Sequence, residues 1–202
     1  MVGESLPVRT YGDLMQAVNS QQSVVDLAAA LDTKWVVANF VVFQIAWFTC
    51  IGSVARNLSS LGLAVIAIAV GIHLISVRNR ANALSLAAAS LALGIIIELI
   101  LVNTQATKFD GDALAIGSAP LWMIAMWALF STTLNVSMRW LRGKYVLATV
   151  LGAVAGPLSY FAGSKMGALS LPLDYSLLII GVCWAAAMPV LLLSAKKWDA
   201  MA

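Results

Sequence analysis

The amino-acid sequence predicts an all-α fold: a polytopic membrane protein, a bundle of six transmembrane helices with a short N-terminal cytoplasmic extension. Of the 202 residues, 61% are hydrophobic and only 10% are charged, whereas a soluble domain carries about 25% charged residues. The apolar residues gather in six runs, each near the roughly 20 residues needed to cross a bilayer. Such runs form helices, because lipid offers the backbone no hydrogen-bond partners.

Residues 1–34 form a polar to mildly amphipathic extension ahead of the first apolar run. Short helices are predicted at 13–18 and at 23–31, and the second begins with the capping pattern Ser23-x-x-Asp26. Two interpretations stay open: a helix that lies on the membrane surface or docks elsewhere, and a loosely ordered tail, since no basic face accompanies the apolar one. The first apolar run starts only after this extension, so it is interpreted as an uncleaved span rather than a signal peptide.

The six predicted spans and the polar segments around them divide the chain into three parts. After the extension comes a transmembrane domain at 35–195, and a short cytoplasmic tail follows at 196–202. The predicted spans are residues 35–55, 59–77, 84–103, 119–138, 145–164 and 173–194.

The basic residues outside the spans predict the orientation of the chain in the membrane. Nine of them fall on the side that holds both termini and three fall on the opposite side. Short loops rich in lysine and arginine stay in the cytoplasm. We therefore expect a multi-pass protein of the bacterial inner (plasma) membrane with both termini in the cytoplasm. The nine are Arg9, Lys34, Arg78, Arg80, Arg139, Arg142, Lys144, Lys196 and Lys197, and the three are Arg56, Lys108 and Lys165.

Charge and cysteine content exclude several classes of function. The net charge of +3 comes from basic residues spread beside the apolar runs rather than gathered in one patch, so no nucleic-acid partner is expected. Cys50 and Cys183 lie inside apolar runs, and no cysteine or histidine stands at metal-ligand spacing from them. No metal and no cofactor is predicted. The partner that the composition requires is the lipid bilayer.

Glu98 is the only carboxylate inside any of the long apolar runs. A carboxylate in hydrocarbon is costly, so it normally faces a partner or a wet cavity. At about 1.5 Å per residue, it lies roughly 20 Å from the inner end of its span and about 7 Å from the outer end. Its expected neighbours are the outer ends of the fourth and fifth spans. These residues define a candidate binding site, the outer group: Glu98, Trp122, Ser159 and Tyr160.

A second set of polar residues lies near the predicted inner ends of the spans. Thr132, Asn135 and Arg139 share one helix face because they follow i, i+3, i+7 spacing. Two interpretations stay open: hydrogen bonds that hold helices together, and a site for a lipid phosphate or carboxylate. His73 is about 13–15 Å from Glu98 along the membrane normal, which argues against a direct pair. This candidate site, the inner group, comprises Asn39, His73, Thr132, Asn135 and Arg139.

The fifth span carries a stripe of small residues. Gly152 and Gly156 are four residues apart, and Gly163 extends the stripe. Small residues let another helix approach closely, while Pro157 removes a backbone donor and predicts a kink. Helix packing is the simpler interpretation of these four residues. The functional one is a break whose freed carbonyl lines a cavity beside Tyr160.

Three strings of polar and aromatic residues carry a resemblance to a known family. They are Asn39-Phe-x-x-Phe-Gln44-x-x-Trp47-Phe, Pro120-Leu-Trp-Met-x-x-x-Trp127-x-x-Phe130-x-Thr-Thr-Leu-Asn135-x-Ser-x-x-Trp140-Leu and Gly156-Pro-Leu-Ser-Tyr160-x-x-Gly163. Over residues 36–195 the chain resembles an uncharacterised bacterial inner-membrane family, domain of unknown function 2878. The resemblance implies a compact bundle of helices and no assigned activity. It also implies an association with lipid-modifying enzymes, near which members of such families are often encoded.

Three functions are compatible with these observations, and no catalytic residue is assigned. The leading one is an accessory or scaffold component of lipid or envelope metabolism, with a membrane protein or lipid enzyme as partner, because the polar residues are few and scattered. The second is a small transporter or lipid-handling protein that uses Glu98 as a proton-linked or headgroup-facing site. The third is a membrane-embedded lipid-modifying enzyme built on the inner group.

Overall fold

The computed structural model describes residues 11–109 and 114–201, and the chain divides into two compact units, Met1–Ala38 and Asn39–Ala202. α1 (Tyr11–Val54) contributes to both units. The two short helices predicted in the N-terminal extension are parts of this one helix rather than separate elements, and residues 1–10 of the extension lie outside the described residues. The hydrogen bonds and the cavity of the candidate site lie within the second unit.

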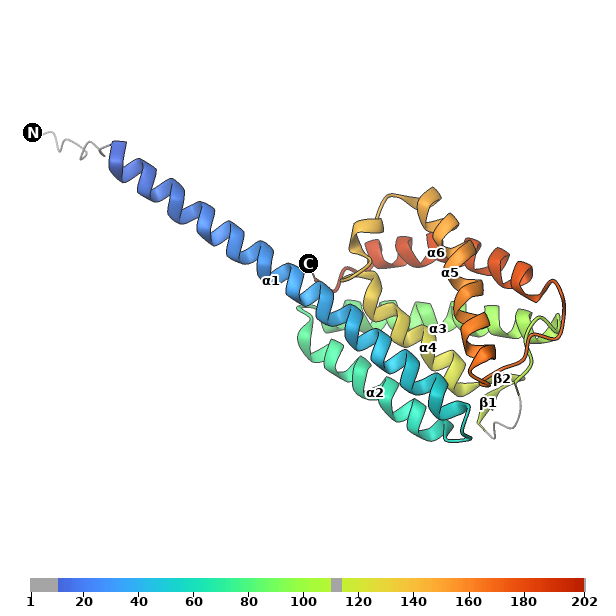
Figure 1. Cartoon of the computed structure of the whole chain (residues 1–202). Helices are drawn as coiled ribbons and strands as arrows, with labels where there is room; N and C mark the ends of the chain where they lie inside the picture. The colour runs from blue at the N-terminus through green and yellow to red at the C-terminus, as the bar shows by residue number, and fades with distance from the viewer. Residues whose placement is uncertain (1–10, 110–113, 202) are drawn as a thin grey trace, which may run out of the picture. The chain divides into compact units, whose positions relative to one another are not determined.

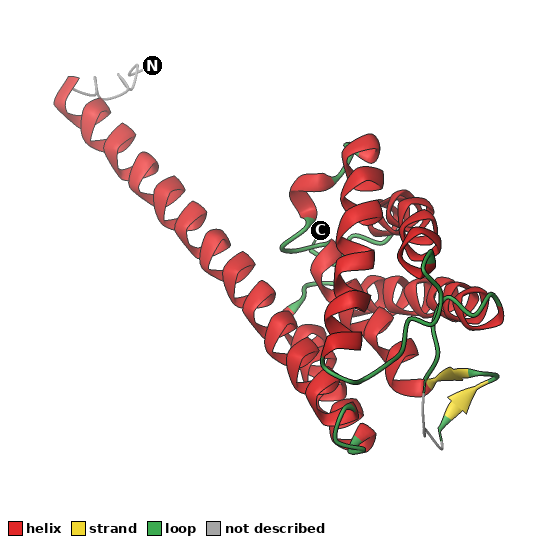
Figure 2. Ribbon diagram, turned by 45° about the vertical axis from the view of Figure 1, so that its right-hand side comes forward, coloured by secondary structure: helices red, strands yellow, loops and turns green. Residues whose placement is uncertain are grey.

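The second unit is built from helices with one small hairpin (Figures 1 and 2). In the hairpin, two strands of two residues each pair antiparallel in the connection between α3 and α4. After α1 the elements are α2 (Ser59–Ser76), α3 (Arg80–Asn103), β1 (Ala115–Ile116), β2 (Ala119–Pro120), α4 (Leu121–Leu134), the 3-10 helix η1 (Arg139–Leu141), α5 (Tyr145–Lys165) and α6 (Ser176–Lys197).

Within the described residues, five helices are long and apolar enough to cross a membrane, which confirms the all-α polytopic fold. They are the Thr33–Val54 portion of α1 together with α2, α3, α5 and α6. Apolar side chains cover the outside of these helices: Ile75 on α2 is 70% exposed and Val146 on α5 is 81% exposed. A surface of this kind needs lipid rather than water around it.

α4 differs from the predicted fourth span, 119–138. It covers 14 residues, or about 21 Å, which is shorter than the roughly 30 Å hydrocarbon core of a bilayer. Ten of its residues are buried, and it packs against α2, α3 and α6. A helix that is buried on nearly all sides is a core element. α4 is therefore the central helix of the unit.

The polar residues at the end of α4 explain why it stops early. The hydroxyls of Ser131, Thr132 and Thr133 donate hydrogen bonds of 2.7, 2.8 and 2.7 Å to carbonyls three residues earlier. Such bonds compete with the helical ladder. The N–H groups of Val136 and Met138 both bond to the Thr133 carbonyl. The chain thus tightens into turns that lead to η1 instead of continuing as a span.

α5 and α6 pack against each other (Figure 1), and Gly152 and Gly156 of α5 lie at this contact. A Cβ atom on Gly152 would lie 2.5 Å from the Trp184 carbonyl oxygen, and one on Gly156 would lie 2.3 Å from the Trp184 ring. Gly163 lies instead beside Leu169. α5 continues as a helix through Pro157. The absence of side chains at Gly152 and Gly156 thus makes room for Trp184 between the two helices.

Two connecting loops are joined at the end of the unit where α3 and α5 both end. Lys108 and Ser170 exchange backbone hydrogen bonds of 2.9 and 2.8 Å. This bridge links the loop after α3 to the loop between α5 and α6. It ties together the helix ends that carry Glu98 and Tyr160.

Candidate functional site

Glu98 lies fully buried on α3, five residues before the helix ends, with an exposed fraction of 0%. Its Oε1 atom accepts two hydrogen bonds: one of 3.0 Å from the Trp127 indole N–H on α4, and one from the Tyr160 hydroxyl on α5. Its Oε2 atom is buried and has no hydrogen-bond partner among the described residues. The carboxyl group therefore joins three helices while one of its oxygens stays unused.

The structure brings together part of the predicted outer group. Tyr160 contacts Glu98, as depth counting along the spans suggested. Among the described residues no hydrogen bond joins Trp122 to Glu98, and the Trp122 ring packs edge to face against Phe109, with ring centroids 5.6 Å apart. The Ser159 hydroxyl donates a 2.7 Å hydrogen bond to the Gly156 carbonyl within its own helix.

Trp127 is the member of this site that sequence reasoning missed. The sequence predicts Trp122 in this place instead, because Trp122 stands at the start of the predicted fourth span. Measured from the actual start of α4, Trp127 lies about 9 Å along the helix axis. That depth is close to the depth of Glu98, about 7 Å from the end of α3. Helix bounds accurate to two residues would therefore have indicated Trp127 as a neighbour of Glu98.

A cavity of about 430 Å³ lies between the Asn39–Val54 portion of α1 and helices α4, α5 and α6. Its volume falls in the range of about 300–1,000 Å³ typical of ligand pockets. Methionines, small and aliphatic residues, and the polar side chains of Gln44 and Ser159 complete its walls. We call it the aromatic cavity, because seven aromatic side chains line it: Phe43, Trp47, Phe48, Trp127, Phe130, Tyr160 and Trp184.

The aromatic cavity and Glu98 share two residues. Trp127 and Tyr160 line the cavity and also donate the two hydrogen bonds to Glu98. Trp127 stacks on Trp184, with ring centroids 4.8 Å apart and planes at 18°, and Phe130 meets Trp184 edge-on at 5.4 Å. Glu98 is thus separated from the cavity by these side chains, and its hydrogen bonds orient Trp127 and Tyr160, which form part of the cavity wall.

The predicted inner group is divided between separate places. The Asn39 amide on α1 donates to the Thr132 carbonyl at 3.2 Å and accepts from the Ser137 hydroxyl at 2.9 Å. These bonds join α1 to the end of α4. His73 on α2 is buried, and its Nδ1 atom has no hydrogen-bond partner among the described residues. Neither residue joins the contacts that Asn135 and Arg139 make.

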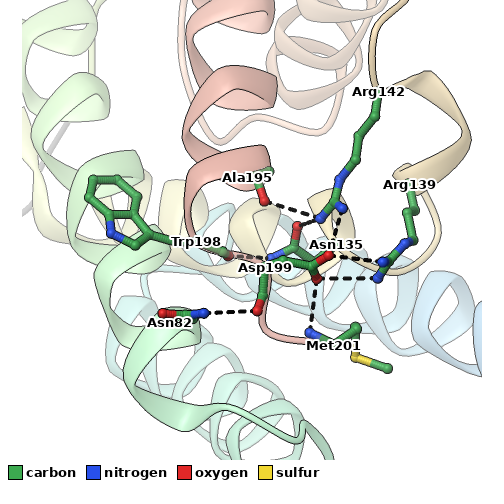
Figure 3. Close-up of polar contacts among 8 residues, drawn as sticks. All are labelled: Asn82, Asn135, Arg139, Arg142, Ala195, Trp198, Asp199 and Met201. Atoms are coloured by element: carbon green, nitrogen blue, oxygen red, sulfur yellow. Dashed lines mark hydrogen bonds and ion pairs between the residues drawn. The ribbon is translucent and has the colours of Figure 1, made fainter.

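Asn135 and Arg139 belong to a polar network around the end of the chain (Figure 3). The Asn135 amide donates to the Trp198 carbonyl at 2.8 Å. Arg139 holds the Asp199 carboxylate with two bonds, at 2.8 and 3.2 Å, and Arg142 reaches it at 2.8 Å. We call this network the C-terminal cluster; its members are Asn82, Asn135, Arg139, Arg142, Ala195, Trp198, Asp199 and Met201.

Arg142 is the centre of the C-terminal cluster. Besides Asp199 it donates to the Asn135 side-chain oxygen and, at 3.1 Å, to the Ala195 carbonyl. Its side chain is 18% exposed, against 45% for Arg139. The Asn82 amide on α3 donates to the Asp199 carbonyl at 2.9 Å. The cluster therefore fastens the segment after α6 to α3 and to the turn after α4.

The environment of Asp199 favours its ionised form. Burial alone would raise the pKa of this carboxyl group. Hydrogen bonds from Arg142 and from the Met201 N–H, together with the charges of both arginines, outweigh burial and hold the pKa below its usual value. Sequence reasoning missed Arg142 and Asp199 as site residues. The sequence feature that indicates them is Asp199 itself, a single carboxylate that follows the two lysines at the end of α6.

Comparison with known proteins gives one match. A family profile described as "Protein of unknown function (DUF2878)" matches residues 36–190. That range contains Glu98 and every residue that lines the aromatic cavity, whereas Asp199 lies beyond it. No curated protein and no solved structure matches the chain.

Proposed function

Because the chain belongs to the DUF2878 family of proteins of unknown function, we propose its role from the site itself: it takes a lipophilic molecule from the bilayer into the aromatic cavity. It does so as an accessory component of lipid or envelope metabolism in the inner (plasma) membrane of a bacterium. The observation that carries the proposal is a cavity of about 430 Å³ with aromatic walls, two of which are held by hydrogen bonds to a buried carboxyl group.

The chemistry of the cavity walls supports a lipophilic ligand. Ligand pockets are mostly apolar, with a few polar groups that fix orientation. Here the polar groups are Gln44, Ser159 and Tyr160. Aromatic rings offer a large, rigid contact area, and methionines such as Met126 and Met188 adapt to irregular shapes. A molecule with an apolar body and one polar group fits this set.

The contacts of the inner group support an accessory role over an enzymatic one. Asn135 and Arg139 bond to the protein's own C-terminal residues, and Asn39 bonds to the end of α4. Groups engaged in this way stabilise the fold rather than await a substrate. A lipid-modifying reaction at the inner group would require the C-terminal cluster to open first.

An accessory role implies a partner, which we propose to be a membrane protein or lipid enzyme. Purification in a mild detergent should recover that partner in a constant ratio to this protein. Recovery of this protein alone, under conditions that keep known membrane complexes intact, would count against the accessory role and leave ligand binding untouched.

A second candidate function is a proton-linked transporter. It is favoured by one observation: the Glu98 carboxyl group, next to the cavity wall, has a buried oxygen without a hydrogen-bond partner in the described part of the chain. Intramembrane carboxyl groups with few partners are typical of proton relays. Uptake of a lipophilic substrate into proteoliposomes, driven by an imposed pH gradient, separates transport from binding alone.

The proposed orientation, with both termini in the cytoplasm, follows from the basic residues. Arg78 and Arg80 lie around the connection from α2 to α3, and Lys196 and Lys197 lie at the end of α6. Single cysteines introduced at Arg80 and at Lys165 should react with an impermeant maleimide from opposite sides of the membrane. Labelling of both from the same side would contradict the orientation.

The cavity itself is tested by filling it. Ala155 lines the cavity, whereas the neighbouring Val154 does not and is 55% exposed. Protein purified in mild detergent should carry a lipophilic molecule at near one per chain by native mass spectrometry. Ala155→Phe should lose that molecule, and the matched control Val154→Phe should keep it. Equal amounts in all three proteins would overturn the proposal.

A further inference from the structure

We propose that the ligand of the aromatic cavity is a lipophilic cation, and that Glu98 releases its proton when this cation binds. The inference rests on the proposed function, since it names the chemical class of the molecule held in the same cavity. Two features carry it together: a fully buried carboxyl group that lacks a cationic partner among the described residues, and aromatic walls that stand between this group and the cavity.

Glu98 is uncharged when the cavity is empty. A carboxylate inside a membrane span needs a neutralising partner. Among the described residues, the hydrogen-bond partners of Glu98 are the neutral donors Trp127 and Tyr160, and Arg139 and Arg142 pair with Asp199 instead. With neutral neighbours only, the carboxyl group of the empty protein is stable in its protonated form.

The proton of the neutral Glu98 side chain lies on Oε2. Oε1 accepts both hydrogen bonds, so the proton belongs on Oε2, which has no partner among the described residues. The titratable groups that face Glu98 from the neighbouring helices are the Tyr160 hydroxyl on α5 and the Cys183 thiol on α6. Both are neutral acids, so neither supplies the positive charge that an ionised Glu98 requires.

The aromatic walls of the cavity suit a cation. The faces of aromatic rings attract cations, and cages of such rings are used to hold substituted ammonium groups. Trp47, Trp127 and Trp184 line the cavity together with Tyr160. Tyr160 touches the ligand space on one side and Glu98 on the other. A cation in the cavity therefore interacts with the rings directly and with the carboxylate across one side chain, in a medium where charges are poorly screened.

Cation binding and proton release are then one exchange. The O–H bond of Glu98 breaks, its proton passes to water, and one positive charge enters the cavity, so the net charge of the site does not change. The two hydrogen bonds at Oε1 remain and stabilise the carboxylate. Because the cation competes with a proton, its binding tightens as the pH rises.

Two ions of the same shape and opposite charge test this inference. Tetraphenylphosphonium is a lipophilic cation and tetraphenylborate is its anionic counterpart. Binding to the full chain in detergent micelles is followed by tryptophan fluorescence and calorimetry, with empty micelles as background. Wild-type protein should bind the cation more tightly than the anion by about tenfold or more, and should release close to one proton per cation bound into weakly buffered solution.

The variants separate the carboxyl group from the cavity. Glu98→Gln should weaken cation binding by about tenfold or more and abolish proton release. Asp174→Asn, which removes an exposed carboxylate outside the cavity, should change neither. If Glu98→Gln does not fold, the pH dependence of cation binding to wild-type protein gives the answer alone: tighter binding at pH 8 than at pH 5 supports the exchange.

The two proposals fail in different ways. Equal affinity for the two ions, with no proton release and no pH dependence, overturns the cation inference while leaving ligand binding intact. Failure of the cation to bind, with a native ligand that Ala155→Phe does not displace, overturns the proposed function as well. Displacement of the bound cation by a short-chain phosphatidylethanolamine identifies the natural ligand as a lipid amine. Displacement only by alkylammonium ions identifies it as a free amine.

Discussion

Tyr160 on α5 donates its hydroxyl hydrogen bond to Glu98 on α3, across 62 residues of sequence. Both side chains are buried, yet Tyr160 also lines the aromatic cavity. The pair therefore connects the only carboxyl group within the described membrane-spanning helices to the space in which a ligand can bind.

The Tyr160 hydroxyl and Glu98 should be energetically coupled. Tyr160→Phe removes one of two donors to a buried oxygen and should lower the free energy of unfolding by about 1 kcal/mol. In a Glu98→Gln background the same change should cost less, because the acceptor has already changed. Thermal unfolding in detergent micelles of the two single variants and the double variant measures the coupling; strict additivity would show that the bond contributes nothing.

Gly156 should tolerate no side chain. A Cβ atom there would lie 2.3 Å from the Trp184 ring, so Gly156→Ala must displace a wall of the cavity. We expect a loss of about 1–3 kcal/mol in stability, the usual cost of overpacking. The matched control is Gly71→Ala on α2, where no atom lies within 4 Å of the new Cβ. Equal melting temperatures for the two variants would contradict the close approach of α5 and α6.

Arg142 should matter more than Arg139 to the C-terminal cluster. Arg142 is largely buried and bonds to Asn135, Ala195 and Asp199, whereas the Arg139 side chain is 45% exposed and bonds, within the described residues, only to Asp199. Arg142→Ala should cost about 2 kcal/mol, since it leaves buried acceptors unpaired. Arg139→Ala should cost about 0–1 kcal/mol, as exposed ion pairs do. Limited proteolysis of the segment after α6 should follow the same order, and the reverse order would refute the assigned roles.

Acid should weaken the C-terminal cluster through Asp199. Its pKa in the folded protein is lower than the value of about 3.9 expected for the unfolded chain. A lowered pKa contributes stability that is fully present above the unfolded value and is lost as the pH falls through the folded one. Melting temperatures measured from pH 7 down to pH 3 should therefore fall at the acid end. Asp199→Asn should be less stable at pH 7 and should lose part of that acid-induced decrease; an unchanged pH profile would contradict the coupling.

Much of the fold could be predicted from the sequence because each long helix must cover a fixed thickness of hydrocarbon. The length of α4 could not, because a central helix is as apolar as a lipid-facing one. Its early end depends on Thr133, whose carbonyl accepts two turn hydrogen bonds. Apolarity alone does not show which helices are surrounded by protein.

For the candidate site, the sequence predicted how deep each residue lies along its helix, but not which residues face one another. Counting residues brought Glu98 near Tyr160, but it could not choose Trp127 over Trp122. That choice depends first on where α4 begins, which the sequence placed two residues too early, and then on rotation about the helix axis, since lipid-facing and protein-facing positions of a membrane helix are both apolar. The pairing of Arg142 with Asp199 likewise depends on how the chain turns after α4. Such contacts come from the tertiary structure rather than from any local pattern.

The central claim is that the aromatic cavity holds a ligand beside Glu98 and its two hydrogen-bond donors. A density map at side-chain resolution, from protein transferred directly from its native membrane into lipid nanodiscs, tests it most directly. We predict density enclosed by Trp127, Tyr160 and Trp184 that is absent from a map of Ala155→Phe. A wild-type map with the cavity empty, or closed by its own side chains, would contradict the claim.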